Sequence, residues 1–504
     1  MTPRRGELTR RGFLAGATGA AAVLALAGCG PFGFRAPVNT VGRVDFRNPL
    51  HIPPLAESVQ DGGARVFDLV AQAGRSAIVP SGTAETWGIN GPLLGPTLRA
   101  HRGEQVRIRF RNDLPVPTTL HWHGMHLPAV ADGGPHQMVA PGETWEPGWK
   151  VAQPAASLWY HPHPHGETEI HVYRGMAGLF ILDDDDEAAL PLPRTYGVDD
   201  IPLIVQDKTF DASGGLIETG RGNIGMLGDT ILVNGTLAPV LDLTAERTRL
   251  RILNGSTARS YAFGFSDDRG FHLIATDGGL LREPVPVRRV TLTPGERAEI
   301  VLAATGGESI TLRSFPQDLG LSGGAADMAG ANDELDLLLL RAAATLTPSA
   351  QLPAHLAEIA PLTPPHELDW RKFDLRGVQI NGKTMDMARI DTVVELDTTE
   401  VWEVRNSDGQ PHNFHVHDVQ FQILDLDDAA PPPELSGWKD TVYLPPGRRV
   451  RLIMRFTDYA DPAVPYMYHC HLLWHEDLGM MGQFVVVEPG QAPVAPGPET
   501  GHAH

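Results

Sequence analysis

The sequence is poor in cysteine, in basic residues and in long apolar segments. Only Cys29 and Cys470 are cysteines among 504 residues. We expect no disulfide, because Cys29 is a candidate for lipid attachment and Cys470 for metal binding. Lysine and arginine total 41 against 61 acidic residues, and the formal net charge of −20 argues against a nucleic-acid partner, which needs a basic face. Charged residues make up only 20%, while Gly 54 and Pro 43 are abundant. This composition is typical of a turn-rich, strand-rich globular protein, not of a disordered or coiled-coil chain.

Residues 1–28 have the features of an export signal. A twin-arginine pair, Arg10-Arg11, precedes an apolar run of 16 residues, which is shorter than the about 20 residues of a membrane-spanning helix. The run ends in Leu26-Ala27-Gly28-Cys29, which resembles the lipobox of bacterial lipoproteins. We therefore predict export by the twin-arginine route and anchoring to the outer face of the cytoplasmic membrane or cell envelope through lipid on Cys29. The alternative is that Cys29 belongs to a discarded signal.

The stretch around Cys470 carries the strongest chemical signal. His469 and His471 flank the cysteine, and His475 and Met480 follow closely. A thiolate, two imidazoles and a weak axial thioether form the ligand set of an electron-transfer copper centre. Because neighbouring side chains of a strand point to opposite faces, Cys470 would face one metal centre while His469 and His471 face another. A short covalent path would then join the two centres for electron transfer.

Further histidines stand in closely spaced pairs. In an extended segment, a His-x-His pattern places both imidazoles on one face of the strand. One such pair is often a surface coincidence, but two pairs in one domain indicate a metal site. The clusters are His121-Trp122-His123-Gly124, His161-Pro162-His163 and His412-Asn413-Phe414-His415-Val416-His417.

Turn-rich and proline-rich stretches divide the chain into parts. The predicted parts after the signal are a tether at 29–45, a first domain at 46–185, a second domain at 198–345, a third domain at 366–490 and a disordered tail at 491–504. The second domain holds a single histidine, His272, and no histidine pair. We interpret it as structural spacing between two metal-bearing domains.

An internal repeat indicates that the three domains are related. Arg109-Phe110-Arg111-Asn112 and Glu403-Val404-Arg405-Asn406 each precede a histidine cluster, and Arg251-Ile252-Leu253-Asn254 is the counterpart in the second domain. The economical interpretation is an all-β chain of three related β-sandwiches in series. A single large β-barrel with insertions is the alternative, and it accounts poorly for the repeat.

With these motifs, the sequence resembles the multicopper oxidases, the family of laccases, ascorbate oxidases and bacterial cuprous oxidases. The resemblance covers nearly the whole mature chain. It implies three consecutive cupredoxin-like Greek-key β-sandwich domains and four copper ions, with a trinuclear cluster between domains one and three. It assigns the type-one copper to His412, Cys470, His475 and axial Met480, the type-two copper to His121 and His415, and the binuclear type-three site to His123, His161, His163, His417, His469 and His471.

The resemblance implies an oxidoreductase that couples four one-electron oxidations to the reduction of dioxygen to two waters. We predict cuprous ion as the substrate, with copper detoxification as the purpose and phenol oxidation as a side activity. One alternative is a laccase-like oxidase of phenols, aromatic amines or ferrous ion. Another, of a different class, is a non-catalytic copper-binding or scaffold lipoprotein. We expect a monomer.

Reducing dioxygen consumes protons, so acids are expected beside the cluster. Asp132 and Glu476 resemble the proton-relay positions of the family. The alternative is that both are ordinary loop carboxylates.

A second copper site is predicted for the substrate at Asp386 and Met387, because a thioether with a carboxylate can hold cuprous ion. Similar bacterial cuprous oxidases place such a site in this part of the third domain. Asp327 and Met328 lie in an insertion at 319–332 that could cover it. The alternative is that these methionines pack in the interior.

Overall fold

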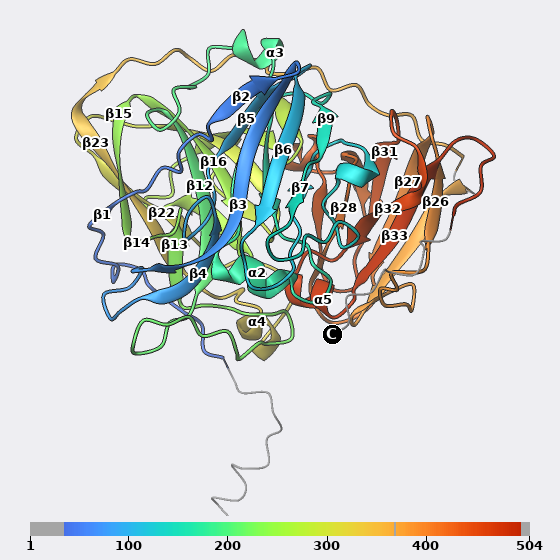
Figure 1. Cartoon of the computed structure of the whole chain (residues 1–504). Helices are drawn as coiled ribbons and strands as arrows, with labels where there is room; N and C mark the ends of the chain where they lie inside the picture. The colour runs from blue at the N-terminus through green and yellow to red at the C-terminus, as the bar shows by residue number, and fades with distance from the viewer. Residues whose placement is uncertain (1–34, 367–368, 495–504) are drawn as a thin grey trace, which may run out of the picture. The chain divides into compact units, whose positions relative to one another are not determined.

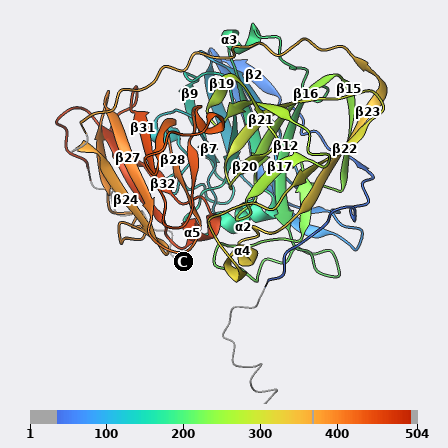
Figure 2. The same cartoon turned by 180° about the vertical axis from the view of Figure 1, so that it is seen from behind.

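The computed structural model describes residues 35–366 and 369–494, and the described residues from Pro37 onward belong to one compact unit. The predicted signal, Cys29 and residues 495–504 of the predicted tail lie outside the described residues. The regular structure is mostly β-strand, in six sheets that form three consecutive sandwiches (Figures 1 and 2). The all-β, cupredoxin-like fold class is therefore confirmed, and the single barrel is excluded. Within the described residues, none of the helices has the length and apolar character needed to cross a membrane.

The first sandwich follows the alternation of its sequence. Along β6 the side chains of Val106, Ile108 and Phe110 are buried, while the arginines between and after them are half-buried or exposed. One sheet holds, in spatial order, β2 (Ser58–Asp61), β3 (Ala64–Ser76), β6 (Gln105–Asn112) and β8 (Thr144–Trp145), with β4 (Ala84–Ile89) beside β3 and β9 (Gly148–Lys150) beside β6; the other holds β5 (Leu98–His101), β11 (Gly178–Asp183), β10 (Ala156–His161) and β7 (His121–His123). Short helices are η1 (Ala129–Ala131), α2 (Thr168–Arg174) and α3 (Asp185–Ala188).

The second sandwich also holds part of the predicted tether. In the predicted tether, the N–H of Val38 donates to Asp333 Oδ1 at 2.8 Å, so this part of the chain is bound to the second sandwich. β1 (Asn48–Pro49) belongs to the start of the predicted first domain, but it lies in a sheet of the second sandwich, where it pairs with β15. One sheet is β1, β15 (Pro239–Ala245), β23 (Leu335–Thr347), β22 (Ser309–Ser314), β17 (Tyr261–Phe265) and β20 (Val290–Leu292); the other is β14 (Thr236–Leu237), β13 (Thr230–Val233), β12 (Asp200–Lys208), β16 (Arg247–Asn254), β21 (Arg297–Ala303), β18 (Phe271–Thr276) and β19 (Gly279–Val287). Helix α4 (Gly324–Met328) lies in the predicted insertion.

The third sandwich contains the remaining strands. One sheet is β25 (Gln379–Ile380), β24 (Arg371–Arg376), β27 (Thr399–Asn406), β31 (Arg449–Arg455) and β29 (Phe421–Leu426); the other is β26 (Thr392–Glu395), β33 (Met481–Val487), β32 (Asp461–His469), β28 (His412–Val416) and β30 (Thr441–Leu444). Helices η3 (Pro433–Leu435) and α5 (Leu473–Asp477) lie in its loops. Part of the predicted tail is ordered against this domain, since the N–H of Val494 donates to Pro462 O at 2.7 Å.

The predicted repeat has a structural role in each sandwich. Parallel pairs β3–β6, β12–β16 and β24–β27 each end at an asparagine, respectively Asn112, Asn254 and Asn406. Each buried amide donates to two backbone carbonyls, and its Oδ1 accepts the N–H two residues later. The repeated asparagine therefore fixes the loop that follows its strand. In the first and third sandwiches this loop leads into a histidine strand.

The histidine strands meet where the first and third sandwiches join. One continuous apolar core includes Phe67 and Trp122 of the first sandwich and Trp402 and Phe484 of the third, whereas the second sandwich has its own core. Strands β7 and β28 lie close together in both views (Figures 1 and 2). This junction positions the candidate sites.

Candidate metal centres

Three predicted ligands, His412, Cys470 and His475, form what we call the sulfur site, within the third sandwich. His412 begins β28, Cys470 follows β32, and His475 lies on α5. Cys470 Sγ lies 3.6 Å from Nδ1 of each histidine, and the two Nδ1 atoms are 3.1 Å apart. All three side chains are buried. This arrangement of two imidazoles and one thiol is that of an electron-transfer copper site.

The surroundings of Cys470 favour the metal-binding thiolate. Burial by itself would raise the pKa of the thiol, but hydrogen bonds and charge from His412 and His475 lower it to about 5. The thiol is therefore ionised at neutral pH, the form that ligates metals. Met480 is fully buried, and its carbonyl accepts the N–H of Cys470 at 3.1 Å, so the predicted axial residue lies beside the site.

Oxygen atoms lie against the outer ring nitrogens of the sulfur site. His412 Nε2 is 3.3 Å from Asp408 Oδ2, and His475 Nε2 is 2.9 Å from the carbonyl oxygen of Asn223 in the second sandwich. Asp408 is 16% exposed, so its carboxylate lies between solvent and the buried imidazole. Burial would lower the pKa of His412, but Asp408 and Cys470 raise it to about 9. We did not predict Asp408 or Asn223 from the sequence.

The eight other histidines predicted as copper ligands form a second site, which we call the imidazole cluster. Its members are His121, His123, His161, His163, His415, His417, His469 and His471, and all are buried. The rings of His121 and His417 stack with centroids 3.8 Å apart, and those of His123 and His415 stack at 3.7 Å. A pair from the first sandwich thus interlocks with a pair from the third.

The ring nitrogens of the cluster converge in separate groups. Nε2 of His469 lies 3.2 Å from Nε2 of both His163 and His417. Nε2 of His161 lies 3.4 Å from Nδ1 of His123. The groups are His163, His417 and His469; His123, His161 and His471; and His121 and His415 together with His123. This grouping agrees with the predicted division among type-two and type-three coppers, although the ligand roles themselves stay predictions.

The ring nitrogens of the imidazole cluster are arranged to bind metal ions. Backbone carbonyls of Asp132 and Asp440 accept Nδ1–H of His121 and His415 at 2.8 Å, which turns the Nε2 atoms inward. Those two Nε2 atoms, and both ring nitrogens of His471, are buried without a hydrogen-bond partner in the structure. An unpaired buried polar atom costs about 1–3 kcal/mol, and coordination by a copper ion removes this cost.

Burial keeps most of the cluster imidazoles neutral, as metal ligation requires. It lowers the pKa of four of them well below the usual value, and mutual repulsion of the rings adds to the effect; these are His123, His161, His415 and His417. The pKa of His163 falls to about 4 and that of His471 to about 3 for the same reasons. For His469, burial would lower the pKa, but the carboxylate of Glu476 raises it.

Both predicted acids lie at the cluster. Asp132 Oδ2 is 2.8 Å from His417 Nδ1, and Glu476 carboxylate oxygens are 3.4 Å from His163 Nδ1 and 3.1 Å from His469 Nδ1. Both acids are buried. Burial would raise the pKa of Glu476, but His163 and His469 hold it well below its usual value. The structure thus places both beside the cluster, rather than on exposed loops, and their relay role stays a prediction.

Three consecutive residues connect the sulfur site to the cluster. The thiol of Cys470 belongs to the sulfur site, while the imidazoles of His469 and His471 belong to two groups of the cluster. The structure therefore has the alternation that the sequence predicted, although β32 itself ends at His469.

The predicted substrate-copper residues belong to neither site, although the N–H of the neighbouring Met385 donates to the carbonyl of Gly479, next to Met480, at 2.9 Å. Asp386 Oδ1 accepts the N–H of Ala388 at 3.0 Å, and Oδ2 lies 3.5 Å from the guanidinium of Arg389. Met387 is half-buried, and its carbonyl accepts Nε2–H of Gln483 at 3.1 Å. Among the described residues, Asp386 joins none of the clusters that could hold a metal. Asp327 Oδ1 accepts an amide N–H of Asn332 at 2.6 Å.

Other histidines near the motifs have protein partners. His126 lies 2.8 Å from Asp418 and 3.1 Å from Asp458, which links the first and third sandwiches. His136 bonds to a glutamine and His171 to a threonine. None of the three belongs to a candidate metal group within residues 35–366 and 369–494.

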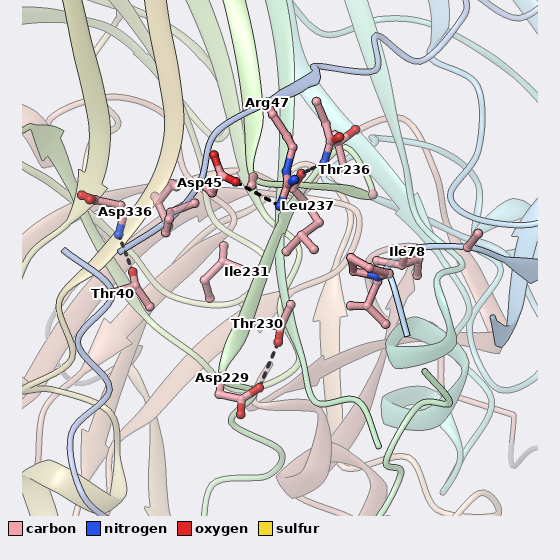
Figure 3. A pocket seen from close by; sticks show the side chains of 18 of the residues that line it. Thr40, Asp45, Arg47, Ile78, Asp229, Thr230, Ile231, Thr236, Leu237 and Asp336 are labelled. Carbon is pink, nitrogen blue, oxygen red and sulfur yellow. Dashed lines mark hydrogen bonds and ion pairs between the residues drawn. The ribbon is translucent and has the colours of Figure 1, made fainter. Parts of the chain in front are cut away.

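A surface pocket of about 840 Å³ is lined by no residue of either site, and Figure 3 shows its lining side chains. The segment from Thr40 to Asn48 lines it together with β13, β14 and the start of β23. Its polar groups are paired, for example Arg47 with Asp45 at 3.0 Å and Thr230 with Asp229 at 3.0 Å. The pocket contains no histidine or cysteine, so it offers none of the donors that the two sites share.

Comparison with known proteins agrees with this geometry. Family models described as multicopper oxidase match residues 72–187 and 360–490. The multicopper oxidase mco of Staphylococcus haemolyticus (strain JCSC1435) is 36% identical over 87% of this chain and 93% of its own length. The cell division protein FtsP of Escherichia coli (strain K12) is 34% identical over 87% of this chain and 93% of its own. The crystal structure of a laccase from Pediococcus acidilactici Pa5930 superposes with a TM-score of 0.80 at 35% identity, covering 88% of this chain and 94% of that one.

The motifs, the three sandwiches, the buried donor sets and these relatives lead to one assignment. The chain belongs to the multicopper oxidase family and is a copper oxidoreductase that uses dioxygen as acceptor.

Proposed function

We propose that the protein oxidises cuprous ion and reduces dioxygen to water, with copper detoxification as its purpose. The observation that carries the choice of substrate is Asp408, whose partly exposed carboxylate lies 3.3 Å from the outer nitrogen of His412. The negative charge of this carboxylate, between solvent and the sulfur site, attracts a small cation. The outer nitrogen of His475 is hydrogen-bonded to the carbonyl oxygen of Asn223, so backbone covers this edge of the ring.

In this proposal the protein holds four coppers. The sulfur site with Met480 holds the type-one ion, His121 and His415 hold the type-two ion, and the two groups of three histidines hold the type-three pair. When bound, the ions supply one-electron uptake at the thiolate and dioxygen reduction at the imidazoles. Asp132 and Glu476 orient the cluster histidines and relay protons from solvent to the cluster.

The test compares cuprous-ion oxidation with phenol oxidation in the copper-loaded protein and in Asp408→Asn and Met387→Ala. We expect Asp408→Asn to raise the KM for cuprous ion about tenfold, the effect of losing about 1.4 kcal/mol of attraction, and to leave the KM for a neutral phenol unchanged. A selective loss in Met387→Ala instead would place substrate copper at Asp386 and Met387. If neither variant affects cuprous oxidation selectively, cuprous ion is not the substrate recognised here.

Two alternatives are retained. A laccase-like oxidase of phenols, aromatic amines or ferrous ion would show a higher kcat/KM for one of these donors than for cuprous ion.

A non-catalytic copper-binding or scaffold role is suggested by the similarity to FtsP. All twelve predicted ligands are present and the ten histidines and the thiol are gathered in two buried sites, which a scaffold does not require. A copper-loaded protein that consumes no oxygen with any of these donors would favour the scaffold.

Export and anchoring form a separate part of the proposal. Residues 1–28 direct twin-arginine export, and lipid on Cys29 tethers a monomer to the membrane. We expect Cys29→Ser to move the protein from the membrane fraction to the soluble envelope fraction without changing its copper content. An unchanged membrane association would contradict the lipid anchor.

A further inference from the structure

The guanidinium of Arg297, at the start of β21, joins all three sandwiches beside the imidazole cluster. It is 1% exposed, and all five of its N–H groups are used. Nε donates to Ser157 O at 2.9 Å, Nη1 to Gly295 O at 3.1 Å, and Nη2 to Asp277 O at 2.9 Å. The remaining two donate to the carboxylate of Asp440 at 2.8 and 2.6 Å. Such a two-point bond fixes both the distance and the plane of the carboxylate.

Asp440 transmits this position to one histidine from each metal-bearing sandwich. Its Oδ1 lies 3.0 Å from His123 Nε2, and its carbonyl oxygen lies 2.8 Å from His415 Nδ1. The hydroxyl of Thr441 donates to Asp440 Oδ1 at 3.0 Å and lies 3.2 Å from both of those ring nitrogens. When His123 donates from Nε2, its Nδ1 is left free to face His161.

Two glycines show how closely the second sandwich approaches the cluster. A Cβ on Gly124, the glycine of the first histidine motif, would lie 2.5 Å from Asp440 Oδ2 and 2.7 Å from Arg297 Nη2. A Cβ on Gly295 would lie 3.0 to 3.1 Å from three ring atoms of His471. The Arg297–Asp440 pair therefore fills the space directly behind the ligand strand.

The pair belongs to a larger buried network of charges. Lys439 Nζ lies 2.8 Å from Asp277 and 2.9 Å from Glu296. Buried ion pairs are poor substitutes for apolar packing as a source of stability, because desolvation offsets much of their attraction. Fixing one arrangement of neighbouring groups is the better-supported reason to keep such a pair.

We propose that Arg297 and Asp440 are positioning residues for the imidazole cluster, so that the second sandwich completes the copper site without supplying a ligand. Arg297 holds the Asp440 carboxylate, and Asp440 sets the ring orientation of His123 and His415. The proposal rests on the proposed ligand set. It also replaces our interpretation of the second domain as a structural spacer.

The test measures copper retention in full-length protein carrying Arg297→Lys or Asp440→Asn. Lysine keeps the charge but loses the two-point bond, and asparagine keeps the shape but loses the charge. The matched control is Arg251→Lys. Arg251 is likewise buried and donates hydrogen bonds to Asp200, Glu299 and Ser157, none of which is a histidine. Each copper-loaded protein is dialysed against increasing concentrations of chelator. We then measure copper per chain, the blue absorption and the electron paramagnetic resonance of the cluster. The unfolding temperature is recorded for the copper-free form.

We expect both variants to lose cluster copper at about 10–100-fold lower chelator concentration than wild type and Arg251→Lys, while the blue absorption of the sulfur site is kept. Loss no greater than in Arg251→Lys would overturn the proposal. Parallel loss of blue and cluster copper with a lowered unfolding temperature would also overturn it, since that is general destabilisation. His123→Ala distinguishes failure of the proposed ligand set from failure of the positioning role. If His123→Ala keeps all its copper, the ligand set is wrong. If His123→Ala loses cluster copper but Arg297→Lys and Asp440→Asn do not, only the positioning role fails.

Discussion

The sulfur site and the imidazole cluster differ in how much of the molecule each one needs. All predicted ligands of the sulfur site lie in the third sandwich, and Cys470 and His475 are five residues apart. The cluster requires β7 and β10 of the first sandwich, β28 and β32 of the third, and the contacts of Arg297 from the second. Docking of the first and third sandwiches is therefore needed to assemble the imidazole cluster, whereas the ligands of the sulfur site come together within one sandwich. Changes at domain interfaces should therefore affect the cluster first.

The largest expected effect separates the two sites completely. Cys470→Ser removes the sulfur that lies 3.6 Å from both His412 and His475, so the blue colour should vanish and oxidase activity should fall to background. The copper of the cluster should stay, because its eight histidines are unchanged. Visible absorption and copper per chain measure both outcomes, with Cys29→Ser as the control that stays blue. Persistent blue colour in Cys470→Ser would disprove the thiolate assignment.

The next effect concerns only the cluster. In Asp132→Asn or Glu476→Gln, the rate of dioxygen reduction should fall by about 10²–10⁴-fold, because an acid beside the cluster is lost. Reduction of the sulfur site by substrate without oxygen should proceed at the wild-type rate, as followed by stopped-flow bleaching of the blue colour. Glu167→Gln, at an exposed carboxylate, is the control. Equal slowing of both steps would argue against a relay role.

A smaller effect tests the space behind the ligand strand. Gly124 has φ +85°, and a Cβ there would collide with Arg297 and Asp440, so Gly124→Ala should lower the free energy of unfolding by about 2–4 kcal/mol and release cluster copper. Gly142→Ala is the matched control, because its φ is +82° but no atom lies within 4 Å of the added Cβ. Its cost should be only about 1 kcal/mol. Denaturant unfolding and copper per chain are the measurements, and equal effects of the two changes would refute the packing argument.

The smallest effect concerns the junction of the first and third sandwiches. Burial would lower the pKa of His126, but Asp418 and Asp458 raise it to about 9. Because this pKa lies above the usual 6.5, the stabilisation is complete below about pH 6.5 and is lost as pH rises through 9. His126→Gln should therefore lower the unfolding temperature by about 2 °C at pH 6 and by less at pH 10. Calorimetry at both pH values checks this, and a pH-independent difference would contradict it.

Much of this architecture follows from local patterns. The alternation of β6 and the repeated asparagine at positions 112, 254 and 406 predicted related sandwiches, and both have the expected places. The histidine spacing predicted two sites linked through Cys470. Asp408, Asn413 and Asp440 were not predicted. Asn413 Oδ1 accepts the N–H of His471 at 2.6 Å, a contact between residues 58 positions apart that no local pattern reveals.

The identity of the donor atoms could be predicted from the sequence alone, because residue types and their period along a strand are local properties. It could not determine which oxygen holds each imidazole, or that the second sandwich reaches the cluster through Arg297. Several of those contacts join residues more than a hundred positions apart, such as Arg297 and Asp440 or His123 and Asp440. Only docking of the sandwiches brings them within hydrogen-bond distance. The amino-acid sequence therefore specifies the predicted ligands, whereas their alignment depends on contacts that form only when the three sandwiches pack together.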